Sequence, residues 1–191
     1  MKPVNLILLP GMDGTGTLFE PLRQALPAYV RTTVISYPPD RPLGYDELLP
    51  IVLQALPQNE PYVLLGESFS GPLALMVAAT KTSDTKGVIL CASFIRNPLP
   101  LNVSWLGSLF SLAVQIAPNP LRLGILLGKG PSDALKRLVS ETVSSVSPSV
   151  MAFRIRSVID VDCTSALRAC LAPILYISAT EDPLVTRNSF N

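Results

Sequence analysis

The chain has 191 residues, enough for one domain at roughly 100–200 residues per domain. Hydrophobic residues make up 48% of it and charged residues 15%, a composition that excludes a disordered chain. The net charge is +1 without a dense basic run, and these residues include no His, so the sequence argues against nucleic-acid binding and against a histidine base or metal ligand. We expect neither a metal nor a cofactor.

Five short runs rich in apolar and β-branched residues predict β-strands. Each run is nearly continuous rather than alternating, which is typical of strands buried on both faces of a parallel sheet. The predicted strands are Val4–Leu9, Thr32–Tyr37, Tyr62–Leu65, Gly87–Ala92 and Ile174–Ser178.

Helical patterns separate the first four of these strands. The predicted helices are Phe19–Leu26, Tyr45–Leu56 and Ser70–Thr80. Strands that alternate with helices through short connections predict a doubly wound α/β fold with a parallel sheet.

A long insert separates the fourth and fifth predicted strands. We interpret residues 97–160 as a helical cap over the carboxyl ends of the strands, within a single domain of residues 1–191. The alternative is that the insert only extends the core. Its predicted segments are Trp105–Ile116, Leu121–Leu127, Ser132–Ser144 with Ser132 as N-cap, and Pro148–Val158, and a further helix, Cys163–Leu171, precedes the last strand.

The apolar runs and the cysteines predict where the protein resides. The run at residues 5–9 is too short for a signal peptide, and prolines interrupt the longest uncharged stretch, residues 97–121, so we expect no membrane span. Cys91, Cys163 and Cys170 are an odd number without metal-ligand spacing, and they are interpreted as small buried hydrophobic residues. These features predict a cytoplasmic protein.

The strongest chemical motif is GESFSG, from Gly66 to Gly71. A buried strand ends there and a helix begins within a few residues, which is the context of a nucleophile elbow. Gly66 and Ser70 supply the small residues that the turn needs two positions before and after Ser68; glycine is usual at the second position, but serine is small enough to be tolerated. The turn would expose the Ser68 hydroxyl and aim the Phe69 backbone N–H at a developing oxyanion.

A glycine-rich loop, LPGMDGTG, follows the first predicted strand. In a sheet of order 2-1-3-4-5, the connections after strands one and three diverge and form the ligand crevice. The loop would face the Ser68 turn, and the Met12 backbone N–H could supply a second oxyanion donor. A dinucleotide fingerprint fails because Phe19 stands at its third glycine, and a phosphate loop fails because Thr17 replaces its lysine. A plain glycine turn is the alternative.

Two acidic residues, Glu181 and Asp182, follow the last predicted strand. In hydrolases whose triad runs Ser, acid, His along the chain, the acid that orients the imidazole lies in such a loop. Asp182 is the better candidate. The alternative is that it caps a helix with Pro183 in its first turn.

These three motifs, in this order, resemble the α/β-hydrolase family, more narrowly its small bacterial esterase-like members with an LPGMDGTG loop and a GESFSG elbow. The segment CASFIRNP, residues 91–98, is similar to that group as well. The resemblance implies Ser68 as nucleophile, Asp182 as triad acid, and Met12 and Phe69 as oxyanion-hole donors. We further expect Gly11, Asp13 and Glu67 to bind substrate.

The resemblance also implies a catalytic His in a loop beyond the acid, after one more helix and strand. Only nine residues follow Asp182, so we expect a chain that is C-terminally truncated before the last helix, the last strand and that His. A serine hydroxyl without a base is a poor nucleophile, so we expect impaired turnover, unless a carboxylate of raised pKa or another chain supplies the base. The last strand would be an exposed hydrophobic edge, which predicts a homo-oligomer.

The expected function is a serine esterase that hydrolyses small-molecule carboxylic esters through an acyl-Ser68 intermediate, with an acyl pocket in the apolar cap. Two alternatives stay open. One is an acyltransferase that passes the acyl group to an alcohol. The other is a hydrolase-fold binding protein without turnover, which the absent His favours.

Overall fold

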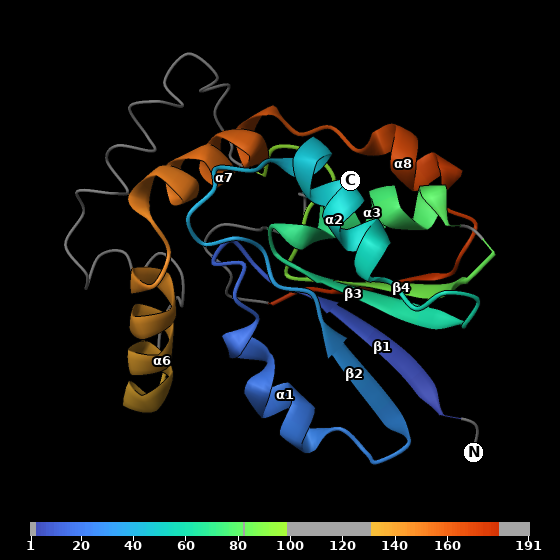
Figure 1. Ribbon diagram of the computed structural model, residues 1–191, viewed down its shortest axis with the longest axis horizontal. Coiled ribbons are helices and arrows are strands. Elements are labelled where there is room, and N and C mark those ends of the chain that lie inside the picture. Colours follow the sequence, from blue (N-terminus) through green and yellow to red (C-terminus); the bar gives the residue numbers. More distant parts are fainter. Residues whose placement is uncertain (1–2, 82, 99–130, 180–191) are drawn as a thin grey trace.

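Five parallel strands form one sheet at the centre of the molecule (Figure 1). The computed structural model describes residues 3–81, 83–98 and 131–179. The strand order is β2-β1-β3-β4-β5, so the order 2-1-3-4-5 on which the crevice argument depends is confirmed. The strands are β1 (Val4–Leu9), β2 (Val30–Val34), β3 (Tyr62–Glu67), β4 (Thr85–Cys91) and β5 (Ile174–Ile177).

Helices lie on both faces of the sheet, which confirms the doubly wound α/β fold. On one face lie α2 (Tyr45–Ala55), α3 (Ser70–Thr80) and α8 (Thr164–Ala169), and on the other lie η1 (Thr17–Phe19) and α1 (Glu20–Ala25) (Figure 1). Helix α3 contains no charged residue and is buried along most of its length, because it packs against β3, β4, α2 and α8. This central helix begins directly after the GESFSG turn, so the core fixes the position of the turn.

The second predicted strand, Thr32–Tyr37, is wrong at both ends. β2 pairs with β1 over Val30–Val34 and then leaves the ladder, because β1 itself turns into the glycine-rich loop. The chain follows that loop: the Tyr37 N–H donates to the Gly14 carbonyl at 2.7 Å. Tyr37 is thereby placed at the carboxyl edge of the sheet instead of within it.

The prediction that all five strands are buried on both faces is correct for β1 and β3 and wrong for the other strands. β1 and β3 carry continuous runs of buried residues, whereas β4 alternates buried with partly exposed residues and β2 and β5 alternate partly with fully exposed ones. In β5, Leu175 is 55% exposed and Ile177 46% exposed on the face that carries α1. A central strand has helices above and below it, but an edge strand is covered on one side only.

The described part of the predicted insertion consists of two helices, α6 (Asp133–Ser144) and α7 (Pro148–Asp160). The Ser132 N-cap is confirmed, since its hydroxyl accepts a hydrogen bond from the Leu135 N–H at 3.2 Å. Helix α7 extends two residues beyond its predicted end and contributes Val158 to the main core. The segments Trp105–Ile116 and Leu121–Leu127 lie outside the described residues, and the cap stays a prediction.

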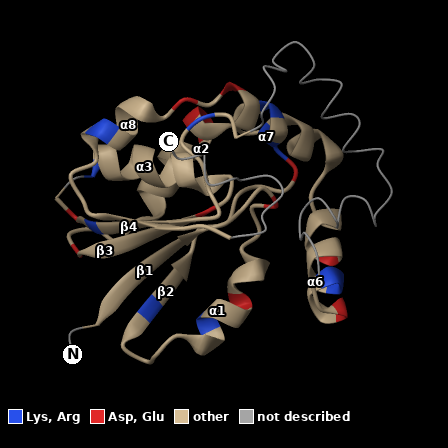
Figure 2. Ribbon diagram, turned by 180° about the vertical axis from the view of Figure 1, so that it is seen from behind, with Lys and Arg blue, Asp and Glu red and all other residues tan. Residues whose placement is uncertain are grey.

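Charged residues are scattered along the described helices and loops, without a continuous basic stripe in that part of the chain (Figure 2). No helix within residues 3–81, 83–98 and 131–179 is long and apolar enough to cross a membrane.

Self-association through β5 is a testable expectation, because Leu175 and Ile177 expose apolar surface on a strand at the end of the described sheet. We expect the wild-type chain to form dimers or larger assemblies at micromolar concentration, and Leu175→Lys to shift them toward monomer. Light scattering coupled to gel filtration measures both. Thr33→Lys is the control, because Thr33 is exposed on β2, the strand at the opposite edge of the sheet. A monomeric wild type would contradict the expectation.

Candidate active site

Ser68 forms the sharp strand-to-helix turn predicted from GESFSG. Its φ of +48° lies in the left-handed region, which costs an L-residue about 1–2 kcal/mol. β3 ends at the preceding residue and α3 begins two residues later. The Ser68 N–H donates to the Cys91 carbonyl at 2.9 Å, and the residue is partly exposed. The strained turn therefore presents Ser68 at the carboxyl edge of the sheet.

Gly66 is required by the close approach of α3 to β3. A Cβ at this position would lie 2.5 Å from the Ser70 carbonyl oxygen and 3.0 Å from Ala74 Cβ, both in the first turns of α3. A side chain at residue 66 would push the helix away from the strand. The packing that holds the helix start near Ser68 depends on this glycine.

The peptide bond between Ser68 and Phe69 is held by its carbonyl. The Ser68 carbonyl accepts from the Ser93 hydroxyl at 2.6 Å and from the Gly71 N–H at 3.2 Å. Carbonyl and N–H point in opposite directions across a trans peptide, so the Phe69 N–H faces away from these donors. Within the described residues this N–H donates no hydrogen bond.

The Phe69 side chain anchors the same peptide in the core. Its ring is buried, stacked on Tyr45 at a centroid distance of 4.7 Å and edge-on to Tyr37 at 6.4 Å. The Tyr45 hydroxyl donates to the Phe69 carbonyl at 2.9 Å. The amide proposed as an oxyanion donor is thus fixed on both sides.

The loop after β1 lies next to this turn, and each of its carbonyls from residue 10 to residue 15 accepts a hydrogen bond. Since the Gly11 carbonyl is turned toward the Gly14 N–H, the following Met12 N–H points the other way, and it donates no hydrogen bond within the described residues. The donors, in order along the loop, are Ser70 Oγ, Gly14 N, Arg154 Nη1 (twice), Tyr37 N and Ser36 Oγ.

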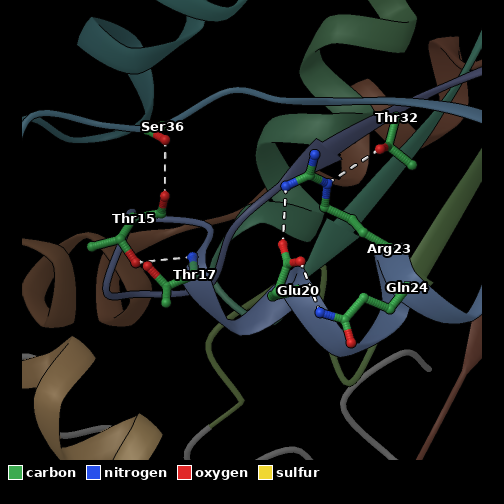
Figure 3. A network of polar contacts seen from close by, with 7 residues as sticks. All are labelled: Thr15, Thr17, Glu20, Arg23, Gln24, Thr32 and Ser36. Carbon is green, nitrogen blue, oxygen red and sulfur yellow. Dashed lines mark hydrogen bonds and ion pairs between the residues drawn. The ribbon is translucent and has the colours of Figure 1, made fainter.

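Short side chains brace the outer half of this loop. The buried Asp13 carboxylate accepts from the Thr15 N–H at 2.8 Å and from the Thr15 hydroxyl at 2.6 Å. The Thr15 carbonyl accepts from the Ser36 hydroxyl, and its own hydroxyl accepts from the Thr17 N–H (Figure 3). These hydrogen bonds therefore hold the loop in place up to the start of η1, although the loop contains no helix or strand.

Arg154 reaches this loop from α7 and was not predicted from the sequence. Its fully buried guanidinium donates to the carbonyls of Met12 (2.8 Å), Asp13 (2.9 Å) and Pro38 (3.0 Å). A Cβ on Gly14, whose φ is +72°, would lie 2.6 Å from Nη1. A cation in the apolar stripe of the predicted helix, four residues from Val150 and Val158, is the signal that could have revealed it.

Glu67 and Ser70, on either side of Ser68, both contact the loop. The Glu67 carboxylate accepts from the Gly11 N–H at 2.8 Å, while the buried Ser70 hydroxyl donates to the Pro10 carbonyl and lies 2.6 Å from the Tyr37 hydroxyl. Ser70 is therefore an active part of the packing, where the sequence suggested only a tolerated replacement of glycine.

The predicted substrate contacts have partners within the protein. Gly11 and Asp13 are buried, and Glu67 is half-buried against the Gly11 N–H. Substrate binding by these three residues stays a prediction. Asp182 lies outside the described residues. Within the described ranges, the Ser68 hydroxyl has no hydrogen-bond partner and no cluster of His, Cys, Asp or Glu could hold a metal.

Burial and the nearby Asp13 raise the pKa of Glu67 to about 7, although the Gly11 N–H opposes this rise. Between the usual value of 4.5 and about 7, the folded chain holds a proton that the unfolded chain has released. We therefore expect the free energy of unfolding to fall as the pH rises through this interval, by about 1.4 kcal/mol for each unit of pKa difference. Urea unfolding at several pH values measures the slope.

Glu67→Gln is the matched variant, since it keeps a hydrogen-bond acceptor for the Gly11 N–H and removes the titration. Its stability should change less with pH across the interval than that of the wild type. Equal slopes in the two proteins would contradict the assignment of the proton to Glu67.

Solved structures with this architecture include several hydrolases. An esterase from Exiguobacterium antarcticum superimposes with a TM-score of 0.82 at 15% identity, covering 98% of this chain and 78% of that chain. A hydrolase from Pseudomonas aeruginosa gives a TM-score of 0.77 at 19% identity, covering 98% and 76% of the two chains. An enol-lactonase from Burkholderia xenovorans gives 0.74 at 15% identity, covering 99% and 77%. At these identities the likeness establishes the fold.

Two sequence comparisons extend this result. The chain is 38% identical over 104 residues to phytyl ester synthase 1, chloroplastic, from Arabidopsis thaliana; the match covers 50% of this chain and spans only 15% of that protein. Residues 6–189 match the model of the alpha/beta hydrolase family. The chain therefore belongs to the alpha/beta hydrolase family.

Proposed function

We propose that this chain is a serine esterase, in which Ser68 attacks the carbonyl carbon of a small-molecule carboxylic ester. One observation carries the proposal: Ser68 lies on a left-handed turn at the start of α3 that contacts the loop after β1, and the N–H groups of Phe69 in this turn and Met12 in this loop donate no hydrogen bond within the described residues. Family membership and the esterase among the similar structures support it.

The proposed reaction has two steps. Ser68 Oγ bonds to the carbonyl carbon, and the carbonyl oxygen takes up negative charge that the Met12 and Phe69 N–H groups stabilise. Collapse of this intermediate breaks the ester C–O bond, leaves acyl-Ser68 and releases the alcohol with a proton. Water then adds to the acyl carbon and releases the acid, and the Ser68 hydroxyl is restored.

The proton of Ser68 needs an acceptor in the first step. Glu67 has a raised pKa, but its carboxylate faces the Gly11 N–H, and no hydrogen bond joins it to Ser68 in the part of the chain that the structure describes. Asp182 remains the proposed acid, without a His among these 191 residues to orient. Loss of one triad member leaves about 10³–10⁴-fold catalysis over water, so we propose slow turnover.

Labelling with a fluorophosphonate probe tests the nucleophile, because the probe forms a covalent bond with an activated serine. We expect mass spectrometry to find the adduct on the peptide that contains Ser68, and no adduct there in Ser68→Ala. Hydrolysis of p-nitrophenyl butyrate should be slow in the wild type and reach the buffer rate in Ser68→Ala. A wild type that neither reacts with the probe nor exceeds the buffer rate would favour a binding protein without turnover.

A second candidate is transfer of the acyl group from acyl-Ser68 to an alcohol. The similarity to a protein named phytyl ester synthase favours it, since synthesis of such an ester transfers an acyl group to a long-chain alcohol. The two outcomes differ only in whether water or an alcohol attacks the acyl carbon.

Competition between water and an alcohol separates the two candidates. With p-nitrophenyl butyrate as donor and phytol in detergent as acceptor, an acyltransferase should form phytyl butyrate at the expense of free butyrate, and an esterase should form butyrate alone. Chromatography of both products measures the ratio, and Ser68→Ala gives the background.

A further inference from the structure

We propose that Glu67 and Ser70 are positioning residues that clamp one peptide plane of the loop after β1 and so direct the Met12 N–H toward the Ser68 turn. The inference rests on the proposed function, since it assigns to these two residues the geometry of an oxyanion hole. Neither residue needs to touch the substrate for this role.

The clamped unit is the peptide bond between Pro10 and Gly11. Its N–H donates to Glu67 Oε2 at 2.8 Å, and its carbonyl accepts from the Ser70 hydroxyl. The two groups point in opposite directions across the rigid plane, so they are held from both sides. Glu67 immediately precedes Ser68 and Ser70 follows it by two positions. The turn that carries the proposed nucleophile therefore holds the loop by direct hydrogen bonds from residues on both sides of Ser68.

The Ser70 hydroxyl also receives a hydrogen bond, and its direction can be assigned. A carbonyl oxygen only accepts, so the Ser70 proton goes to Pro10, and the Tyr37 hydroxyl at 2.6 Å must donate to Ser70 Oγ. Burial raises the pKa of Tyr37 above its usual value, which keeps this donor protonated. A buried chain of two hydrogen bonds thus holds the Pro10 carbonyl, and each bond polarises the next.

The clamp sets the direction of the next amide. The Gly11 carbonyl turns to the Gly14 N–H at 3.0 Å, and the Met12 carbonyl is held by Arg154 at 2.8 Å. The plane between Gly11 and Met12 is consequently fixed by its neighbours on both sides, and its N–H is the group left without a partner in the described residues. If the Pro10–Gly11 plane were released, the Gly11–Met12 plane could rotate and the Met12 N–H would lose its fixed direction.

The test compares three clamp variants with a matched control. Ser70→Ala removes the hydroxyl, Tyr37→Phe removes its donor, and Glu67→Ala removes the acceptor of the Gly11 N–H. Ser157→Ala is the control, because the Ser157 hydroxyl also donates to a backbone carbonyl, but to that of Phe153 within α7 and not to one of the loop.

Two measurements are made on each protein. The first separates the inactivation rate constant of Ser68 labelling by the fluorophosphonate from the affinity for the probe. The second is amide hydrogen exchange by NMR at Gly11 and Met12, with the amides of β1 and β3 as internal references. A merely structural defect would speed exchange in the strands as well and would not be confined to the loop.

We expect Ser70→Ala to lower the inactivation rate constant about tenfold or more at unchanged probe affinity, because a single oxyanion donor is worth about 10²–10³ in rate. Exchange at Gly11 and Met12 should accelerate while the strand amides keep their rates. Tyr37→Phe should show the same pattern more weakly, Glu67→Ala should lower the inactivation rate constant and accelerate exchange at Gly11 and Met12, and Ser157→Ala should match the wild type.

Wild-type labelling and exchange in Ser70→Ala would overturn the clamp and leave the proposed function intact. If Ser70→Ala does not fold, Tyr37→Phe decides in the same way through exchange at Gly11 and Met12. If the wild type itself is not labelled, the proposed function fails, and the exchange rates alone decide: unchanged rates at these two amides overturn the clamp, and selective acceleration supports it.

Discussion

The geometry of the site depends on one property of the trans peptide bond: its carbonyl and its N–H point in opposite directions. A donor that holds a carbonyl therefore aims the following N–H away from itself. Ser93 and Gly71 do this for the amide of Phe69, and Gly14 does it for the amide of Met12. Within the part of the chain that the structure describes, these two N–H groups are oriented without donating hydrogen bonds of their own.

This arrangement has a conformational cost that the surrounding core offsets. Ser68 sits in the left-handed region, which is unfavourable for an L-residue by about 1–2 kcal/mol. The turn is held because β3 and α3, which flank it, are buried, and because the Phe69 ring is packed against two tyrosines. Gly66 permits the close contact of helix and strand on which this packing depends. Strain at a single residue persists where both neighbouring elements are fixed.

The sequence predicted the local features of this structure well. Apolar, β-branched-rich runs identified the five strands, although not the bounds of β2, and the GESFSG and LPGMDGTG motifs identified the two loops that meet, since strand order places the loops after strands one and three together. The end of β2 was missed because it is set by its partner: β1 stops, and the chain follows the loop to Gly14 instead. The pattern within residues 30–37 carries no mark of that change.

The contacts that hold the site were not predictable in the same way. Tyr37, Ser93 and Arg154 come from three distant parts of the chain, and each acts on a backbone carbonyl, which leaves no recognisable pairing in the sequence. Ser70 looked neutral because its size alone explains its presence in the turn. Its hydroxyl acquires a role only when the Pro10 carbonyl is brought next to it by the fold.

The buried guanidinium of Arg154 restricts movement of α7, the helix that carries it, relative to the loop after β1. A buried charge is costly unless it is compensated, and here three carbonyls and the face of the Tyr37 ring, 5.6 Å from the guanidinium carbon, provide the compensation. Its Nε has no partner within the described residues, so the compensation is incomplete. Movement of α7 away from the loop would remove these contacts and release the carbonyls of Met12 and Asp13 at the same time. Helix α7 is therefore part of the wall that shapes the loop.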